Sequence, residues 1–333
     1  MKRVAIRDVA AEAGVSRSSV SNYLNHPDLL KTATRDRIAS AIERLGFVPS
    51  DAARNIGSGD RTTIGYIAFE LTNPFSGVIG DSIERRAMET GFTVLTCNSA
   101  GSPARQLEYM NLFERRRVAG LIVSPLSDIE PELLGMRKRG TPSVIMGRMA
   151  VHPTQSSVSV ADSLGGEIAA RHLLDIGRRD LVFVGGPLAV AQVSERFEGA
   201  ARAIKDVPGA SLSLVAHEDR TISGGIEAAH MILRRRVRPD AVFAVNDLVG
   251  LGVIEGLQAN GVRVPEDIAV IGFDGDEIGA FAATPLSTVR ASGELVGRHA
   301  YDLLMEVISD AEAARQLVVE PTLVLRDSSA RAS

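Results

Sequence analysis

The 333-residue chain is poor in the residues that build disulfide-linked or metal-bound proteins. Cys97 is its only cysteine, which excludes an intrachain disulfide framework and suits a reducing compartment. The six histidines show no metal-ligand spacing such as H-x-x-x-H. We therefore expect no metal site and no disulfide in this protein.

Long apolar runs are also absent. No stretch approaches the length needed to cross a bilayer, and the residues after Met1 pass directly into charged, helix-like sequence without an apolar signal core. We expect a cytoplasmic protein that has no membrane partner.

Catalytic and cofactor motifs are missing as well. The "GSGD" at 57–60 is not followed by the G-K-[ST] of a phosphate-binding loop, and no G-x-S-x-G elbow occurs. "GGPLAV" and "GLGVIEG" are too loose for a dinucleotide fingerprint. Since no nucleophile, general base or metal cluster stands out, we expect neither an enzyme nor a bound cofactor.

A surplus of positive charge is confined to the start of the chain. The formal net charge is −4, so the protein is not basic all over. Residues 1–60 hold nine basic and seven acidic side chains, a balance of +2, which leaves −6 for the remainder. This asymmetry is mild and proves little alone.

The opening of the chain predicts two short helices joined by a tight turn. In "IRDVAAEA" at 6–13, apolar residues recur at i, i+3, i+4 and i+7, the period of one helical face. Gly14 follows as a helix breaker, and Ser16 can cap the next helix by accepting from its free N–H groups. In that helix Val20 and Leu24 point one way and the polar residues point elsewhere.

A third helix is expected from about Thr34 to Leu45, ended by Gly46, with Phe47 and Val48 closing a small core. Its apolar stripe consists of Ile38, Ala41, Ile42 and Leu45.

From Thr63 onward, short apolar runs alternate with helix-length amphipathic segments, the pattern of parallel sheets covered by helices on both faces. Eight candidate strands lie at 64–69, 92–97, 120–125, 142–147, 180–186, 212–216, 240–246 and 267–274. Candidate helices lie near 77–90, 104–117, 130–139, 163–176, 194–205, 222–236, 247–260 and 294–308. So many strands suit two sheets better than one.

The expected organisation has three parts. Residues 1–48 form the headpiece, 49–60 a hinge with a short helix over 51–56, and 61–333 the core. The core divides into a first lobe, about 61–160 with 290–320, and a second, about 161–289 with 321–330. The pattern predicts an all-α helix-turn-helix unit followed by an α/β core of two lobes, each built on a parallel sheet.

A helix-turn-helix with a polar second helix indicates DNA binding, because the major groove admits one helix and offers hydrogen-bond partners to its outer face. Candidates for base contacts are Arg17, Ser18 and Asn22. Candidates for phosphate contacts are Ser16, Ser19, Ser21, Thr34 and Arg35. The alternative is a plain helical hairpin whose serines are merely solvated.

The stretch "IRDVAAEAGVSRSSVSNYLN" closely resembles the headpiece of the LacI/GalR family of bacterial transcription regulators. It matches the family's D-V-A-x-x-A-G-V-S-x-x-T-V-S-x-x-L-N pattern at almost every fixed position, with Ser19 in place of the usual Thr. The resemblance continues through "GLIVSP", "DIGRRDLVFVGGP", "AVFAVNDLVGLGVIEGLQANGVRVPEDIAVIGFD" and "PLSTVR".

This resemblance implies an N-terminal all-α helix-turn-helix headpiece plus an α/β core of two Rossmann-like lobes, like the core of periplasmic sugar-binding proteins. It implies a homodimer that binds a pseudo-palindromic operator in double-stranded DNA. It also implies a hinge that enters the minor groove, where a leucine kinks the duplex. Ile56 stands at that leucine position, and Ala53 and Arg54 match the family's A-R pair. The alternative for Ile56 is packing against its dimer mate or the core.

The resemblance further implies a small sugar-like effector in the cleft between the lobes. Arg196, Asn246 and Asp274 match frequent ligand contacts in the family, and all three are expected at strand ends. Phe75 could stack on a sugar face and Asn73 could line the same wall. The alternatives are strand-end capping for Asn246 and Asp274, and core packing for Phe75.

One departure from the family concerns Gly147, which stands where many sugar-responsive members carry Asp, next to Arg148. Arg148 either pairs with an acidic neighbour or binds an anionic ligand such as a sugar acid or sugar phosphate.

We therefore expect a ligand-controlled repressor. A periplasmic solute-binding protein and an α/β enzyme are the rival classes. The chain stops without a heptad tail, which favours a dimer over a tetramer. The sequence does not decide whether the effector releases or tightens DNA binding.

Overall fold

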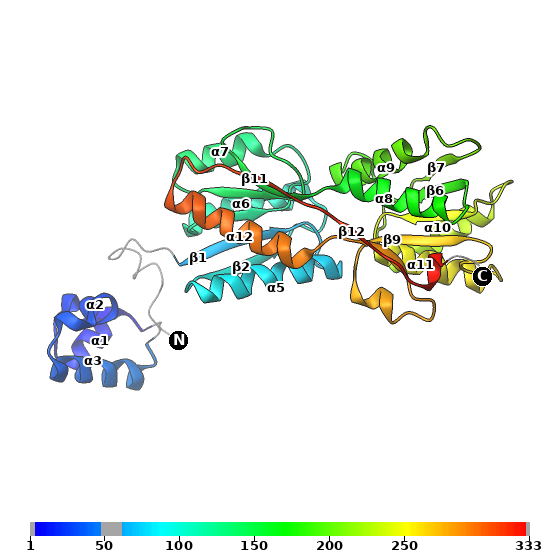
Figure 1. Ribbon diagram of the computed structural model, residues 1–333. Helices are drawn as coiled ribbons and strands as arrows, with labels where there is room; N and C mark the ends of the chain where they lie inside the picture. The colour runs from blue at the N-terminus through cyan, green and yellow to red at the C-terminus, as the bar shows by residue number, and fades with distance from the viewer. Residues whose placement is uncertain (1–3, 48–61, 331–333) are drawn as a thin grey trace. The chain divides into compact units, whose positions relative to one another are not determined.

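A computed structural model describes residues 4–47 and 62–330 of the protein. The chain divides into two compact units, Met1–Arg61 and Thr62–Ser333. The first unit is helical, and the second contains both helices and sheets (Figure 1).

The first unit is a small bundle of α1 (Ile6–Ala13), α2 (Arg17–Asn25), the 3₁₀ turn η1 (Pro27–Leu29) and α3 (Thr32–Leu45). Gly14 and Gly46 end α1 and α3 in the left-handed conformation, as predicted. The third helix begins two residues earlier than expected, with Lys31 as its N-cap. The core of the bundle consists of Val9, Ala10, Ala13, Val20, Ile38, Ala41 and Phe47.

The second unit contains two sheets of six strands. The first sheet has the order β11-β5-β4-β3-β1-β2, and every pair in it is parallel. Its strands are β1 (Thr63–Ala68), β2 (Thr93–Asn98), β3 (Leu121–Val123), β4 (Ser143–Met146), β5 (Ser156–Val160) and β11 (Gln316–Val319).

The second sheet has the order β12-β10-β9-β8-β6-β7, and only the β10–β12 pair is antiparallel. Its strands are β6 (Asp180–Val184), β7 (Ser211–Val215), β8 (Ala241–Ala244), β9 (Ala269–Asp274), β10 (Ser287–Arg290) and β12 (Thr322–Val324). β8 and β9 are buried along their whole length, which explains why they are almost continuously apolar.

Helices flank both sheets (Figure 1). Those encoded before β5 are α5 (Pro74–Glu89), α6 (Pro103–Arg116) and α7 (Glu130–Lys138). Those encoded between β5 and β10 are α8 (Asp162–Asp175), α9 (Ala191–Ile204), α10 (Ile222–Leu233), α11 (Asp247–Ala259) and the 3₁₀ turn η2 (Glu277–Ala280). The short η3 (Asp327–Ser329) follows β12.

The chain returns to the first sheet late in the sequence. α12 (Gly293–Ser309) packs on α5 and β5, as the sequence led us to expect, and β11 then pairs with β5. The lobes are therefore joined by crossovers near Ala161, Ala291 and Glu320.

The eight predicted strands are present, three of them shifted by one residue and the other five shorter than predicted, but β5, β10, β11 and β12 were not predicted. β5 reads "SSVSV", so it has no apolar run, yet every residue in it is buried. Its serines are satisfied by distant backbone: Ser157 Oγ accepts from Ala150 N at 3.0 Å and Ser156 Oγ from Arg315 N at 3.2 Å.

No helix in the described part of the chain is long and apolar enough to cross a bilayer. Within residues 4–47 and 62–330, no group of three or more His, Cys, Asp or Glu side chains is arranged to hold a metal ion.

Candidate DNA-binding surface and effector pocket

The second helix of the headpiece presents a polar face. Arg17, Ser18 and Asn22 are exposed on α2, while Val20 is fully buried. Arg17 forms no ion pair with any residue that the structure describes, so its guanidinium is available to an anionic or base partner. This arrangement is the one that groove reading requires, with apolar anchors inside and hydrogen-bonding groups outside.

Ser16 caps this helix. Its Oγ accepts from Ser19 N at 3.1 Å and lies 2.9 Å from the hydroxyls of both Ser18 and Ser19. Hydroxyls that hold the cap together are also placed at the helix N-terminus, where phosphate oxygens bind well.

The other predicted DNA contacts are less exposed. Ser21, Thr34 and Arg35 are half-buried, and Arg35 Nη2 donates to Thr32 Oγ1 at 3.4 Å. The predicted hinge contacts Ala53, Arg54 and Ile56 lie outside the described residues.

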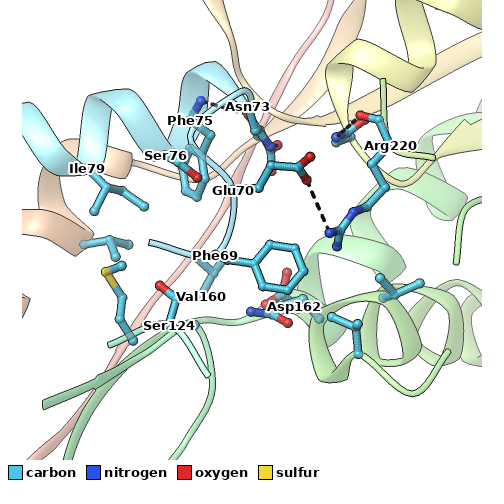
Figure 2. Close-up of a pocket in the computed structure, with 18 of the residues that line it drawn as sticks. Phe69, Glu70, Asn73, Phe75, Ser76, Ile79, Ser124, Val160, Asp162 and Arg220 are labelled. Atoms are coloured by element: carbon cyan, nitrogen blue, oxygen red, sulfur yellow. Dashed lines mark hydrogen bonds and ion pairs between the residues drawn. The ribbon is translucent and has the colours of Figure 1, made fainter. Parts of the chain in front are cut away.

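A cavity of about 130 Å³ lies between the two lobes of the second unit, and we call it the inner cavity. Figure 2 shows side chains from both lobes facing it. Five of the six predicted effector contacts line it: Asn73, Phe75, Arg196, Asn246 and Asp274.

Arg196 is the most engaged of these residues. Its Nε donates to Asp162 at 2.7 Å and its Nη1 to Val245 O at 2.6 Å, with Asp274 3.5 Å away. The guanidinium also stacks 3.5 Å above the Phe273 ring. The prediction that Arg196 lies at a strand end is wrong, because it is in the middle of α9.

Close helix packing explains how a mid-helix residue reaches the cavity. A Cβ on Gly166 of α8 would lie 2.0 Å from Arg196 O, and one on Gly199 of α9 would lie 1.9 Å from Ser163 O. Only glycine permits this approach, which brings Arg196 alongside Asp162 at the start of α8.

Asn246 and Asp274 lie at strand ends, as predicted. Asn246 is the N-cap of α11: its Oδ1 accepts from Val249 N at 2.9 Å and its Nδ2 donates to Arg220 O at 3.1 Å. The capping alternative therefore holds for Asn246, although it also borders the cavity. Asp274 ends β9 with φ +103°, a conformation that costs a non-glycine residue about 1–3 kcal/mol.

Burial raises the pKa of Asp162 and Asp274, and the neighbouring Arg196 opposes the rise for both carboxyls. Burial also raises the pKa of Asp276 to about 7, and the charge of Asp274 adds to the rise. Asp247 Oδ1 and Asp276 Oδ2 are buried with no hydrogen-bond partner among the described residues. Two of these carboxyl groups, Asp162 and Asp274, line the inner cavity, whereas Asp247 and Asp276 are buried outside its lining.

Asn73 is the N-cap of α5, and its Oδ1 accepts from Phe75 N at 2.9 Å. Its Nδ2 donates to Asp274 Oδ2 at 3.0 Å, which links the first lobe to the second. The Phe75 ring lines the cavity and also packs next to Gly293 of α12. Phe75 is therefore both a packing residue and a residue of the cavity wall.

A second link between the lobes was not predicted. Arg220 reaches Glu70 at 3.4 Å and lies 4.2 Å above the Phe69 ring (Figure 2). Burial lowers the pKa of Arg220, while the charge of Glu70 opposes this change.

Arg148 does not line the inner cavity. Its Nη1 donates to Glu130 at 2.7 Å. Of the two alternatives that the sequence left open for Arg148, the structure therefore has the pairing with an acidic neighbour. Glu130 is 6% exposed and also accepts from Val151 N and His152 N. Although burial raises the pKa of Glu130, those hydrogen bonds and Arg148 lower it below the usual value.

Several pocket residues escaped prediction even though a signal for them existed. Phe69 and Glu70 directly follow β1, Ser124 follows β3, and Asp162 follows β5, all at carboxyl ends of parallel strands. Arg220 lies in the loop before α10 and Gln192 in the first turn of α9, both too far from a strand end for strand-end reasoning to reach.

Two family models match the chain. "Bacterial regulatory proteins, lacI family" matches residues 5–50, and "Periplasmic binding protein-like domain" matches residues 170–329. Among curated proteins, the HTH-type transcriptional repressor PurR of Vibrio campbellii is 32% identical over 332 residues, covering 97% of this chain and 98% of the relative.

Solved structures agree. The transcriptional regulator CelR–cellobiose complex is 29% identical with a TM-score of 0.72, covering 98% of this chain and 100% of that one. A LacI family regulator from Enterococcus faecium with bound ribose is 25% identical with a TM-score of 0.74, covering 81% of this chain and 100% of that one. The lac repressor dimer bound to operator and the anti-inducer ONPF, 23% identical with a TM-score of 0.84 and covering 98% and 99%, shares the fold. The chain therefore belongs to the LacI/GalR family, as a transcriptional repressor with a helix-turn-helix headpiece and a periplasmic-binding-protein-like ligand-binding core.

Proposed function

We propose that the protein binds a pseudo-palindromic operator as a homodimer in the cytoplasm, and that a small, uncharged, polyhydroxylated effector in the inner cavity controls this binding. The observation that carries the proposal is the convergence of Asn73, Arg196, Asn246 and Asp274 from both lobes on one cavity. An effector held there contacts both lobes at once and is sensitive to their relative position.

The donor set favours a polyol. Arg196 offers a fork of N–H donors, Asn246 an amide that donates and accepts, and Asp274 a carboxylate that accepts. The rings of Phe69 and Phe75 supply apolar faces for the C–H face of a sugar ring. Relatives solved with cellobiose and with ribose show that this fold accepts such ligands elsewhere.

The charge of the cavity favours a neutral ligand over an anion. Two guanidinium groups, Arg196 and Arg220, face three carboxyl groups, Asp162, Asp274 and Glu70. Arg148, which would have been the additional cation for a sugar acid or phosphate, is paired with Glu130 instead. An anion would therefore enter without an unpaired positive charge to meet it.

DNA binding in this proposal uses α2 in the major groove and the hinge in the minor groove. Arg17, Ser18 and Asn22 read bases, and Ser16, Ser19, Ser21, Thr34 and Arg35 hold phosphates. Two copies read two half-sites because a single headpiece makes few contacts. Ile56 supplies the apolar wedge, so Ile56→Ala should reduce both operator affinity and DNA bending.

The test combines calorimetry with gel retardation. Neutral sugars, sugar acids and phosphates, and purine bases are titrated into the full chain, and each is added to a retardation assay on the DNA upstream of its gene. We expect neutral sugars to bind and to change the retardation, and the sign of the change separates induction from co-repression. Binding of only anions or only purine bases would overturn the effector proposal.

Deleting residues 1–59 provides the second test. Because Thr62–Ser333 is a compact unit, the truncated chain should lose operator binding and keep effector binding. Loss of effector binding in a folded truncated chain would contradict a separate effector site.

A further inference from the structure

A second cavity, of about 320 Å³, adjoins the inner one, and we call it the outer cavity. The loops after β3 and β4 line it from the first lobe, and the loop before α9 lines it from the second. Val190 and Gln192 border both cavities. The outer cavity is therefore a continuation of the same inter-lobe space.

Gln192 borders both cavities, and its amide lies close to Gly147. A Cβ built on Gly147 would lie 2.6 Å from Gln192 Nε2, so the amide occupies the space that a side chain at 147 would take. The Gln192 amide makes no hydrogen bond with any residue in the described ranges. It thus offers a donor and an acceptor at the junction of the cavities.

The outer cavity has a mixed lining without excess positive charge, since Asp128 and Arg148 both border it. Apolar side chains, among them Leu126, Val151 and Ala189, form part of its wall. Arg148 lies there with its charge matched by Glu130, and its Nη2 is 3.7 Å from Asp128, too far for a hydrogen bond. Arg148 Nη2 makes no hydrogen bond to Asp128 and can therefore donate one to a hydroxyl group of a ligand.

The volumes of the two cavities also favour a ligand that extends into both. Small-molecule sites usually measure about 300–1,000 Å³. The inner cavity alone falls below this range and the outer cavity alone reaches its lower end, so a ligand that contacts the inner residues gains the usual volume only by extending into the outer cavity.

We propose that the effector is a neutral two-unit carbohydrate, with one sugar unit in the inner cavity and the second in the outer cavity. The Gln192 amide hydrogen-bonds near the linkage between the units, and Arg148 Nη2 binds a hydroxyl of the second unit. This inference rests on the proposed function and specifies the length of its effector.

The experiment fills the outer cavity and leaves the inner one intact. Ala189 is exposed and lines only the outer cavity, so Ala189→Trp narrows it with little risk to the fold. Leu188→Trp is the matched control, since its neighbour Leu188 is also exposed and lines neither cavity. Calorimetry on the full chain uses cellobiose, maltose, lactose and sucrose as two-unit probes, and ribose, glucose and galactose as single units. Melting temperatures verify that both variants fold.

We expect at least one two-unit probe to bind the unaltered chain, and Ala189→Trp to weaken it at least about tenfold, equivalent to about 1.4 kcal/mol. Leu188→Trp should have no effect, and any single-unit binding should survive both changes. If only single units bind, or if Ala189→Trp leaves two-unit affinity unchanged, the two-cavity inference is overturned while the sugar effector stands. If no sugar of either length binds, the proposed function itself fails.

Discussion

Asn73 of the first lobe donates a hydrogen bond to Asp274 of the second lobe, at 3.0 Å across 201 positions of sequence. Further hydrogen bonds fix the position of each partner. Asn73 caps α5 through Phe75 N, and the residue after Asp274, Gly275, donates from its backbone N to Asp247 at 2.9 Å. The pair therefore ties two rigid elements across the inner cavity. An effector hydroxyl that binds Asp274 competes with this tie, which makes lobe position depend on occupancy.

Asp274→Asn should uncouple the effector from the operator. Hydrogen bonds to charged groups contribute about 1.5–3 kcal/mol, so effector affinity should fall about ten- to hundredfold. Operator binding without effector should persist, because Asp274 lies in the second unit and not in the headpiece. Calorimetry and gel retardation measure the two effects. Glu306→Gln removes an exposed carboxylate that pairs with Arg315 and should change neither quantity.

Stability should depend on pH through Asp276. Its pKa is about 7 in the folded chain, because burial and Asp274 raise it from the usual 3.8. The unfolded state therefore releases this proton near pH 4 and the folded state near pH 7. Stability falls as pH rises between these values, by up to about 1.4 kcal/mol per pH unit, and is level above them. Asp247 has a raised pKa and contributes in the same direction.

Asp276→Asn should flatten this slope, as measured by urea unfolding of the second unit between pH 4 and pH 8. Asp267→Asn is the control, because Asp267 changes stability with pH in the opposite direction. The hydrogen bonds from Arg263 hold the pKa of exposed Asp267 at about 2, so its contribution is lost only as the pH falls below about 4. A slope as steep in the Asp276 variant as in the unaltered chain would assign the pH dependence to other groups, such as Asp247.

Arg17→Ala should change base preference and cost about 1–3 kcal/mol of operator affinity, since the exposed guanidinium is placed to read a base edge. Arg44→Ala is the comparison, because Arg44 is exposed at the end of α3 and pairs with Glu12 at 3.2 Å. Binding to a library of half-sites distinguishes the roles. An equal loss on every DNA sequence would make Arg17 a phosphate contact.

The predictable part of the fold was the part with a local signal. β8 and β9 are buried on both faces, so their apolar runs identified them, and Gly14 and Gly46 marked helix ends. β5 escaped because its polar side chains are satisfied by segments as distant as Arg315, which no local pattern reveals.

The residues of the site also divide into those that the sequence could indicate and those that only the folded chain brings together. Asn246 and Asp274 were predicted because they match frequent ligand contacts of the family, and their places at strand ends agree with the edge at which such sheets bind ligands. The inter-lobe contact of Arg220 with Glu70 joins residues 150 positions apart, and only the assembled lobes create it. Likewise, the sequence left two partners open for Arg148, and folding brought Glu130 beside it.

Gly147→Ala tests the junction of the two cavities through the backbone. Gly147 has φ +93°, and an alanine there costs about 1–2 kcal/mol of folding free energy from backbone strain. Its Cβ would also displace the Gln192 amide, whose flexible end can swing into the outer cavity. Gly177→Ala is matched in φ, at +94°, and has no atom within 4 Å of its added Cβ, so it carries strain alone. Both variants should lose similar stability in urea unfolding, but only Gly147→Ala should weaken binding of a two-unit sugar. Equal sugar affinity in the two variants would show that the position of Gln192 does not matter to the ligand.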